Sequence, residues 1–250
     1  VVDVMRGGPG LGNIGPEQSD YNQVVKGGGH GNYRNLVLAP NSCQEMCDFT
    51  MLAFDLADRY RNPVFVLTDG VIGQMMEAVE LPKPVTHIPD RSEWAVCGTP
   101  LNKNLINSIY LDLDDLERWN MALDAKYRSV KENEVRYEEY LMDDAKIAVV
   151  GYGCVSRVLR STVEMARARG IKVGLFRPIT LFPFPEKQIR AFADRGVEKV
   201  LTVELSTGQL VDDVNLSLQG TLKSDLYYRV GGNVPSALEI LNRISELYGV

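Results

Sequence analysis

The chain has 250 residues, of which 45% are hydrophobic and 24% are charged, and its formal net charge at pH 7 is −6. This length suits one large or two ordinary globular domains, and the modest acidic charge argues against a nucleic-acid-binding surface as the main activity. No apolar run approaches membrane-spanning length and no signal segment leads the chain, so we expect a cytoplasmic protein.

Residues 1–5 form an apolar run that predicts a strand at the very start of this sequence, and residue 1 is not an initiator Met. A buried strand needs neighbours in its sheet, and nothing before it in this sequence can supply them. We therefore expect the chain to be a fragment that lacks an N-terminal part.

Residues 5–16 are rich in glycine and proline, so they predict a tightly turning loop in which backbone can approach a ligand. Arg6, at the end of the first strand, could hold a carboxylate through two parallel hydrogen bonds. The alternative is a surface loop with a solvated arginine, and spacing alone favours that alternative.

Three further residues near this loop are weaker binding candidates. Gln18 and Asp20 follow the loop, although they could simply open a short helix. His30 lies in a second glycine-rich turn and could titrate near neutral pH, but a lone loop histidine is more often solvated than catalytic.

The next segment alternates between strand and helix. Residues 36–39 and 64–67 predict buried strands, and Ser42 with Glu45 predicts a capping box that opens a long helix between them. Asp69 follows the second of these strands, where it could be an exposed turn residue or a helix cap.

Residues 82–143 read as a connector, irregular where it is proline-rich and then helical. We expect a solvated helix over 114–139 that packs one stripe, consisting of Leu116, Trp119, Leu123, Tyr127 and Val130. The four cysteines, Cys43, Cys47, Cys97 and Cys154, contain no Cys-x-x-Cys pair, so we predict reduced thiols and no metal site.

The last third predicts an open, mainly parallel sheet covered by helices. Residues 147–150 form a buried strand, a glycine turn follows, and a helix begins at Ser156, which can cap it, and ends at Gly170. Residues 171–176 form the next strand. A dinucleotide site is disfavoured, because Ser156 replaces the third glycine and Arg177 follows the second strand where an acidic residue is expected. The remaining elements are strands at 199–203 and 226–230 and helices at 208–218 and 235–248.

Several motifs here carry a family resemblance. Residues 166–171 read Ala-Arg-Ala-Arg-Gly-Ile, a strand ends in Arg177-Pro178, residues 181–185 read Leu-Phe-Pro-Phe-Pro, and residues 204–210 read Glu-Leu-Ser-Thr-Gly-Gln-Leu. Together they resemble the C-terminal domain of transketolase-like thiamine diphosphate enzymes. The closest likeness is the α subunit of 2-oxoacid:ferredoxin oxidoreductases of the 2-oxoisovalerate type, in which Arg6-Gly-Gly-Pro9 also has a counterpart.

The resemblance implies an α/β fold in three parts. Residues 1–81 would be the C-terminal half of a pyrimidine-binding, thiamine-diphosphate-type domain, residues 82–143 a crossover linker, and residues 144–250 a transketolase C-terminal-like open parallel-sheet domain. It also implies that Arg6 binds the carboxylate of a 2-oxoacid while Gly7, Gly8 and Gly10 shape the pocket. The expected catalytic glutamate would lie in the missing N-terminal part.

The reaction implied is oxidative decarboxylation of a 2-oxoacid to an acyl-CoA. Thiamine diphosphate and Mg²⁺ would lie mainly on a β subunit, iron-sulfur clusters on other subunits, and ferredoxin would accept the electrons, so the fragment should be inactive alone. Many relatives carry Gly-Pro-Ser-Thr-Gly where this chain has Gly8-Pro-Gly-Leu-Gly12. Loss of two hydroxyls suits a branched, apolar oxoacid.

Two alternatives stay open at this point. One is a β subunit of a 2-oxoacid dehydrogenase or another thiamine-dependent transferase, which would pass acyl groups on without ferredoxin. The other is a noncatalytic assembly module, which would bind a partner chain without substrate-dependent chemistry.

Overall fold

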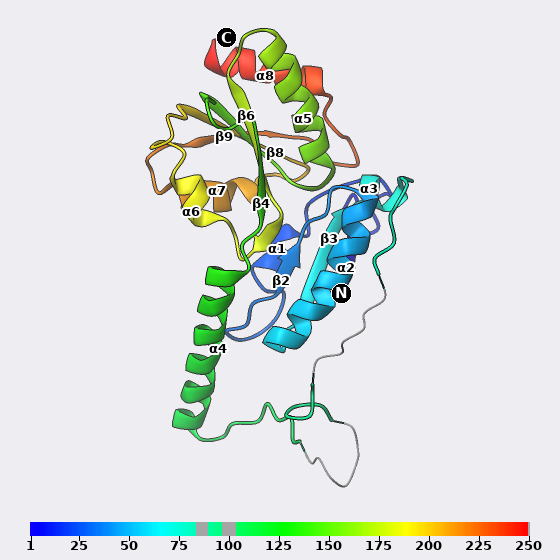
Figure 1. The fold of residues 1–250 in the computed structure, drawn as a ribbon, viewed down its shortest axis with the longest axis vertical. Helices are drawn as coiled ribbons and strands as arrows, with labels where there is room; N and C mark the ends of the chain where they lie inside the picture. Colours follow the sequence, from blue (N-terminus) through cyan, green and yellow to red (C-terminus); the bar gives the residue numbers. More distant parts are fainter. Residues whose placement is uncertain (84–89, 97–103, 250) are drawn as a thin grey trace.

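The computed structural model describes residues 1–83, 90–96 and 104–249, and the strands of these residues form two sheets (Figure 1). The first sheet has the order β1-β3-β2-β7, formed by β1 (Val2–Met5), β3 (Val64–Asp69), β2 (Leu36–Leu38) and β7 (Thr180–Phe182). β1, β3 and β2 are parallel, and β7 pairs antiparallel with β2.

The second sheet has the order β4-β6-β5-β8-β9. It consists of β4 (Tyr137–Tyr140), β6 (Val173–Pro178), β5 (Ile147–Val150), β8 (Lys199–Glu204) and β9 (Ser224–Tyr228). All its pairings are parallel except that of β4 with β6. The predicted open, mainly parallel sheet is therefore confirmed, with one antiparallel strand added at its edge.

Helices cover both faces of the second sheet (Figure 1). Ile147 and Val149 belong to the cluster that α5 (Gly153–Ala168) and α8 (Ala237–Tyr248) complete. Ala148 and Val150 belong to the cluster on the opposite face, with α6 (Glu186–Arg190) and α7 (Leu210–Leu218). Successive residues of a strand point to opposite faces, so a strand buried on both faces reads as the continuous apolar run seen at 147–150.

The first sheet carries α2 (Cys43–Tyr60), with the short helices α1 (Tyr21–Val25) and α3 (Gly70–Gln74) near the strand ends. The Ser42 hydroxyl accepts a hydrogen bond from the Glu45 N–H at 3.1 Å, as the capping box requires. The reciprocal half of the box is absent, because the Glu45 carboxylate accepts from the Asn41 N–H at 2.8 Å and binds Arg177 of β6. A buried arginine from the other sheet thus takes the carboxylate that we expected to cap its own helix.

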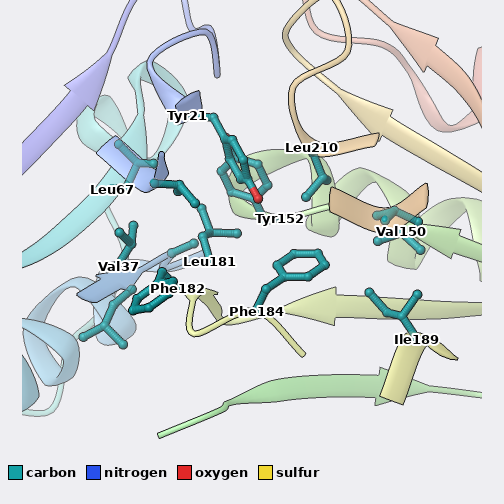
Figure 2. Close-up of a cluster of buried hydrophobic side chains, with 14 of the residues drawn as sticks. Tyr21, Val37, Leu67, Val150, Tyr152, Leu181, Phe182, Phe184, Ile189 and Leu210 are labelled. Atoms are coloured by element: carbon teal, nitrogen blue, oxygen red, sulfur yellow. The ribbon is translucent and has the colours of Figure 1, made fainter. Parts of the chain in front are cut away.

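β7 was not predicted, since residues 180–185 read as the link between a strand and a helix. Its partner β2 lies far away in sequence, and three residues followed by proline give no periodic signal. The pairing returns the chain to the first sheet, so one hydrophobic cluster runs between the two sheets. Figure 2 shows Tyr21, Val37 and Leu67 of the first part with Val150, Tyr152 and Leu210 of the second, around Leu181 and Phe182.

The expected helix over 114–139 is shorter, because α4 spans Leu113–Asn133 and residues 137–140 form β4. Tyr127 and Val130 are buried, but Leu116 and Trp119 of the same predicted stripe are 41% and 46% exposed. The first half of α4 extends beyond the body that its second half packs on (Figure 1). The stripe therefore packs only in its C-terminal half.

The start of α5 also differs from the prediction. The helix begins at Gly153, its N-cap Tyr152 makes no side-chain cap, and the Ser156 hydroxyl is buried inside the helix, where it donates to the Gly153 carbonyl. The Cys154 N–H donates instead to Asp69 Oδ2 at 2.8 Å. A carboxylate of the first sheet thus replaces the local serine cap.

Candidate functional site

A cleft of about 600 Å³ lies at the ends of three strands, which are β1 of the first sheet and β8 and β9 of the second sheet. The carboxyl ends of strands are where open α/β sheets place ligands. Its lining combines the glycine loop after β1 with the loops after β8 and β9, and consists of Arg6, Gly7, Gly8, Pro9, Gly10, Glu17, Ser19, Asp20, Ser206, Thr207 and Val230.

Arg6 lines this cleft and is an exposed residue. Its backbone forms a bridge with Pro16, which closes the glycine loop at its base. The guanidinium Nη1 donates to the carbonyl oxygens of Leu11 and, at 3.4 Å, of Asn13. Among the described residues Nε and Nη2 have no hydrogen-bond partner, so both can donate to a carboxylate, the arrangement that gives arginine its bidentate selectivity.

The glycine loop is held by its own backbone. The Gly7 N–H donates to the Gly15 carbonyl at 2.8 Å, and the Asn13 N–H donates to the Gly7 carbonyl at 2.9 Å. Gly12 has φ +51°, and a Cβ there would lie 1.7 Å from the Gly7 oxygen, so only glycine fits. A Cβ at Gly8 would meet nothing within 4 Å, which leaves room for a ligand on that side.

Glu17 connects the glycine loop to the part of the chain that forms the second sheet. The sequence analysis did not identify this residue. Its side chain is 3% exposed, and its carboxylate accepts from the Gly8 N–H at 3.1 Å, from the Ser19 hydroxyl at 2.9 Å and from the Gly231 N–H. Asn13 adds a second link, because its Nδ2 donates to the Gly231 carbonyl at 3.1 Å. Gly231 follows β9, too distant in sequence for any local pattern to indicate the contact.

Asp20 also lines the cleft. Burial raises the pKa of its carboxyl above the usual value, the negative charge of Glu17 raises it further, and the positive charge of Arg6 opposes the change. Burial, with the Asp20 charge as a smaller cause, raises the pKa of Asp3 as well. The lining of the cleft therefore includes two carboxyl groups, those of Asp20 and Glu17, together with one arginine.

Gln18 and His30 lie outside the cleft. The Gln18 side chain is fully buried, donating to the Tyr152 carbonyl at 3.1 Å and accepting from the Leu205 N–H at 3.0 Å. It ties the first part of the chain to the loops after β5 and β8. His30 is exposed in the turn before β2 and does not line the cleft. The structure thus brings Arg6, Gly7, Gly8, Gly10 and Asp20 together and leaves Gln18 and His30 apart.

The second part of the chain contributes Ser206, Thr207 and Val230, none of which we had named. Glu204 fixes the loop that carries the first two, because its buried carboxylate accepts from the N–H groups of Gln209, Leu210 and Val211, each at 3.0 Å. Burial raises the pKa of Glu204 despite these hydrogen bonds, which act in the opposite direction. The motif at 204–210 therefore shapes one wall of the cleft.

Asp69 is fully buried and accepts from the N–H groups of Val71 and Ile72, so it is a helix cap and the exposed-turn alternative is wrong. Cys43, Cys47 and Cys154 are free thiols, and Cys97 lies outside the described residues. In the described ranges, no three His, Cys, Asp or Glu side chains are grouped as a metal site requires. No helix in those ranges is both long and apolar enough to cross a membrane.

Comparison with known proteins gives two family matches. Residues 1–139 match the family described as pyruvate flavodoxin/ferredoxin oxidoreductase, thiamine diphosphate-binding. Residues 145–240 match pyruvate:ferredoxin oxidoreductase core domain II.

Individual relatives match over nearly the whole chain. The chain is 59% identical to ketoisovalerate oxidoreductase subunit VorB of Methanothermobacter thermautotrophicus, over the whole of this chain and 70% of that protein. It is 32% identical to 2-oxoglutarate synthase subunit KorA of Methanothermobacter marburgensis, over 98% of this chain and 72% of that protein. The structure of 2-oxoglutarate:ferredoxin oxidoreductase from Magnetococcus marinus, with 2-oxoglutarate, coenzyme A and succinyl-CoA bound, shares the fold with a TM-score of 0.81 at 24% identity, over 98% of this chain and 48% of that chain.

Proposed function

The chain belongs to the pyruvate flavodoxin/ferredoxin oxidoreductase family, and we propose that it binds a branched-chain 2-oxoacid for oxidative decarboxylation. Within this family it is similar to the ketoisovalerate oxidoreductase VorB subunits. The family predicted from the motifs is thereby confirmed. The observation that supports the proposal most is that the chain is 59% identical to a ketoisovalerate oxidoreductase subunit along its entire length, but only 32% identical to the 2-oxoglutarate synthase subunit. The family match favours this reaction over a dehydrogenase β subunit.

In the proposed reaction the bond between C1 and C2 of the oxoacid breaks and CO₂ leaves. The acyl group forms a thioester with coenzyme A, and the two electrons released reduce ferredoxin. Thiamine diphosphate, when bound, supplies the electron sink for decarboxylation. The family match assigns a thiamine-diphosphate-binding domain to this chain. The described residues offer no carboxylate cluster for Mg²⁺, and we propose, as the family resemblance implied, that the metal is bound mainly by a partner subunit.

This chain's own contribution is substrate binding. Arg6 directs two free N–H donors at a carboxylate while the Leu11 and Asn13 carbonyls hold its Nη1. Gly7, Gly8 and Gly10 leave space on one side, and Pro9 and Val230 add apolar surface to the lining. A branched aliphatic side chain gains from such surface, whereas a second carboxylate would lie near Asp20 and Glu17 and be repelled.

The chain is a subunit of a multi-subunit oxidoreductase that acts with ferredoxin. We further propose that a β subunit and iron-sulfur subunits complete the enzyme and that this chain is inactive alone. The three described free thiols fit a reducing cytoplasm. For the domain limits we propose 1–81, 82–143 and 144–250, and the gap between the family matches at 139 and 145 supports the last division.

The test is viologen reduction by the full-length subunit co-purified with its partners, under anaerobic conditions, with coenzyme A and thiamine diphosphate. 2-Oxoisovalerate, pyruvate and 2-oxoglutarate are compared at equal concentration. CoA-dependent reduction with the highest kcat/KM for 2-oxoisovalerate is expected. A complex that holds its clusters and thiamine but prefers 2-oxoglutarate would contradict the substrate assignment, and one that reduces viologen with none of the three would contradict the function.

A further inference from the structure

A second cleft, of about 650 Å³, lies at the other end of the first sheet. Its lining comes from the C-terminal end of α2, from the segment 105–110 and from α4, which extends away from both sheets (Figure 1). Asn62 in this lining lies just before β3, whereas the candidate site lies beyond the carboxyl end of the parallel strand β1. The two clefts are therefore separate.

The charge of this second cleft is unbalanced. Its lining contains two cations, Arg61 and Lys126, and no carboxylate. Four other clefts of the described residues each include at least one aspartate or glutamate, and the whole chain has a net charge of −6. A concave site lined by one sign of charge concentrates ligands of the opposite sign, so this cleft favours an anion.

Both cations have hydrogen-bond donors to spare. The Lys126 Nζ donates to Oδ1 of the buried Asn62 at 3.0 Å, and Asn62 is itself held because its Nδ2 donates to two backbone carbonyl groups at 2.9 Å each. Two donors of the ammonium group remain for a ligand. Among the described residues the Arg61 side chain makes no hydrogen bond or ion pair, and its guanidinium carbon lies 5.6 Å from the centroid of the Trp94 ring. Burial lowers the pKa of Lys126, and the charge of Arg61 lowers it further, so the two cations are within electrostatic reach of each other.

The backbone at Arg61 supports a role for its side chain. Arg61 is the C-cap of α2 and has φ +46°, the left-handed conformation in which glycine is favoured and a β-carbon is strained. An arginine at this position destabilises the helix end relative to glycine. A guanidinium that binds a ligand explains why arginine is found there.

An aromatic pair lines the same cleft. The rings of Tyr110 and Trp119 are stacked, with their centroids 5.7 Å apart and an interplanar angle of 21°. Trp119 is 46% exposed, so it retains aromatic surface on which a planar ring can stack. A nucleotide combines a planar base with an anionic phosphate, and binding sites for nucleotides combine aromatic stacking with positive charge. We infer that this cleft binds a nucleotide, with its base on the Tyr110 and Trp119 pair and its phosphate on Arg61 and Lys126.

Two sources have this chemistry, namely a free nucleotide and the adenosine phosphate end of coenzyme A. Both present an aromatic base and a phosphate, which are the groups that the cleft can recognise. Because the cleft is separate from the candidate site, the inference does not depend on which oxoacid the protein uses. Nucleotide binding is also measured without an oxoacid, so its failure would leave the proposed function standing.

The test is isothermal titration calorimetry of the full-length chain with adenosine monophosphate, adenosine and inorganic phosphate. Adenosine monophosphate should bind, and each of its two parts should bind at least about tenfold more weakly, since each engages only half of the cleft. Lys126→Met and Arg61→Gly each remove one charged donor and should raise the Kd of adenosine monophosphate about tenfold or more. Trp119→Ala removes the stacking surface and should raise it about tenfold.

Arg61→Gly has a matched control elsewhere in the chain. Gln219 is the C-cap of α7 and has φ +50°, so Gln219→Gly makes the same kind of backbone change outside the cleft. Both glycine variants should keep or raise the Tm, because glycine relieves the left-handed strain. Gln219→Gly should leave the Kd unchanged, so a loss of binding in Arg61→Gly is a loss of the guanidinium.

Several results would overturn the inference. They are no binding of adenosine monophosphate at about 1 mM, adenosine that binds as tightly as its phosphate, or a Kd that neither Lys126→Met nor Arg61→Gly changes. Binding to the free chain that is lost in the complex with the co-purified partner subunits would also overturn it, because a partner then covers the cleft. Competition by coenzyme A supports the inference and identifies its adenosine end as the ligand, whereas binding without such competition supports it with a free nucleotide as the ligand.

Discussion

Glu17 is the residue whose replacement tests the site most sharply. Replacing it with alanine leaves the Gly8 and Gly231 N–H groups without an acceptor, in a place where the glutamate is only 3% exposed. Gly8 and Gly231 are exposed residues, so water can reach both donors and each lost hydrogen bond costs about 0.5–1.5 kcal/mol. We therefore expect Glu17→Ala to lower the free energy of unfolding by about 1–3 kcal/mol. In a chain of this size that corresponds to a fall in Tm of about 2–12 °C.

The kinetic effect follows from the loop that Glu17 holds. The carbonyl oxygens that position Arg6 belong to this loop, so loosening it lowers the fraction of molecules with the guanidinium in place. A loss of about 2 kcal/mol in loop stability raises KM for the oxoacid roughly tenfold to thirtyfold. The value of kcat should fall as well, because the carboxylate that Arg6 holds is the group that leaves as CO₂, so its contacts change between the ground state and the transition state.

The assay is viologen reduction by the complete complex, combined with thermal unfolding of the same samples. Glu17→Gln retains one acceptor oxygen and should fall between wild type and Glu17→Ala in both measurements. Glu246→Ala is the control, since that exposed carboxylate on α8 only pairs with Arg243 at the surface. Unchanged KM in Glu17→Ala, with the expected fall in Tm, would refute a positioning role and leave Glu17 a purely structural residue.

Three other predictions concern single side chains. Arg6→Ala should lower kcat/KM for the oxoacid about a hundredfold or more while the complex assembles normally. Arg6→Lys should retain only part of the wild-type kcat/KM, because lysine cannot form the bidentate pair with a carboxylate. Normal kinetics of Arg6→Ala would show that Arg6 does not bind the substrate. Arg177→Met should cost about 2 kcal/mol in urea unfolding, because Arg177 is 2% exposed and its loss removes hydrogen bonds to the carboxylates of Glu45 and Glu138. The cost stays below that of a fully buried charge, since both glutamates reach solvent and Glu138 also pairs with Arg160. A change below about 0.5 kcal/mol would contradict this prediction. Because the pKa of Asp20 is raised in the folded state, stability should fall as pH rises from the ordinary value of 3.8 through the raised value, and Asp20→Asn should remove the part of that slope that Asp20 contributes. Identical pH profiles for wild type and Asp20→Asn would show that the carboxyl is not perturbed.

Much of the fold could be predicted from sequence because its signals are local. The continuous apolar run at 147–150 indicates a strand buried on both faces, and β5 is buried on both faces. Ser42 accepts from the Glu45 N–H as its spacing predicts, and Gly170, at φ +79°, follows α5 in the left-handed conformation that a helix end favours. The arginine at a strand end and the glycine-rich turn after it are likewise readable in a dozen residues, but spacing alone favoured a solvated surface loop, and the substrate-binding role of Arg6 and the glycines came from the family resemblance.

The errors have a common origin in contacts between distant residues. Ser156 does not cap α5 because Asp69, from the first sheet, occupies the helix N-terminus instead. Glu45 does not complete its capping box because Arg177 binds it. In both cases a locally consistent pattern was overridden by a charged partner that only folding brings near.

The sequence by itself therefore determined the α/β class, the order of most strands and helices, the family and the arginine at the end of β1. Only the tertiary structure decided that β7 returns to the first sheet, that Glu17 joins the glycine loop to Gly231, and that Ser206, Thr207 and Val230 form the far wall of the cleft. The physical reason is that secondary structure and turns follow from interactions within a few residues, which periodicity and spacing record. The cleft arises where strand ends from two sheets meet, and no local pattern carries the position of one sheet relative to the other.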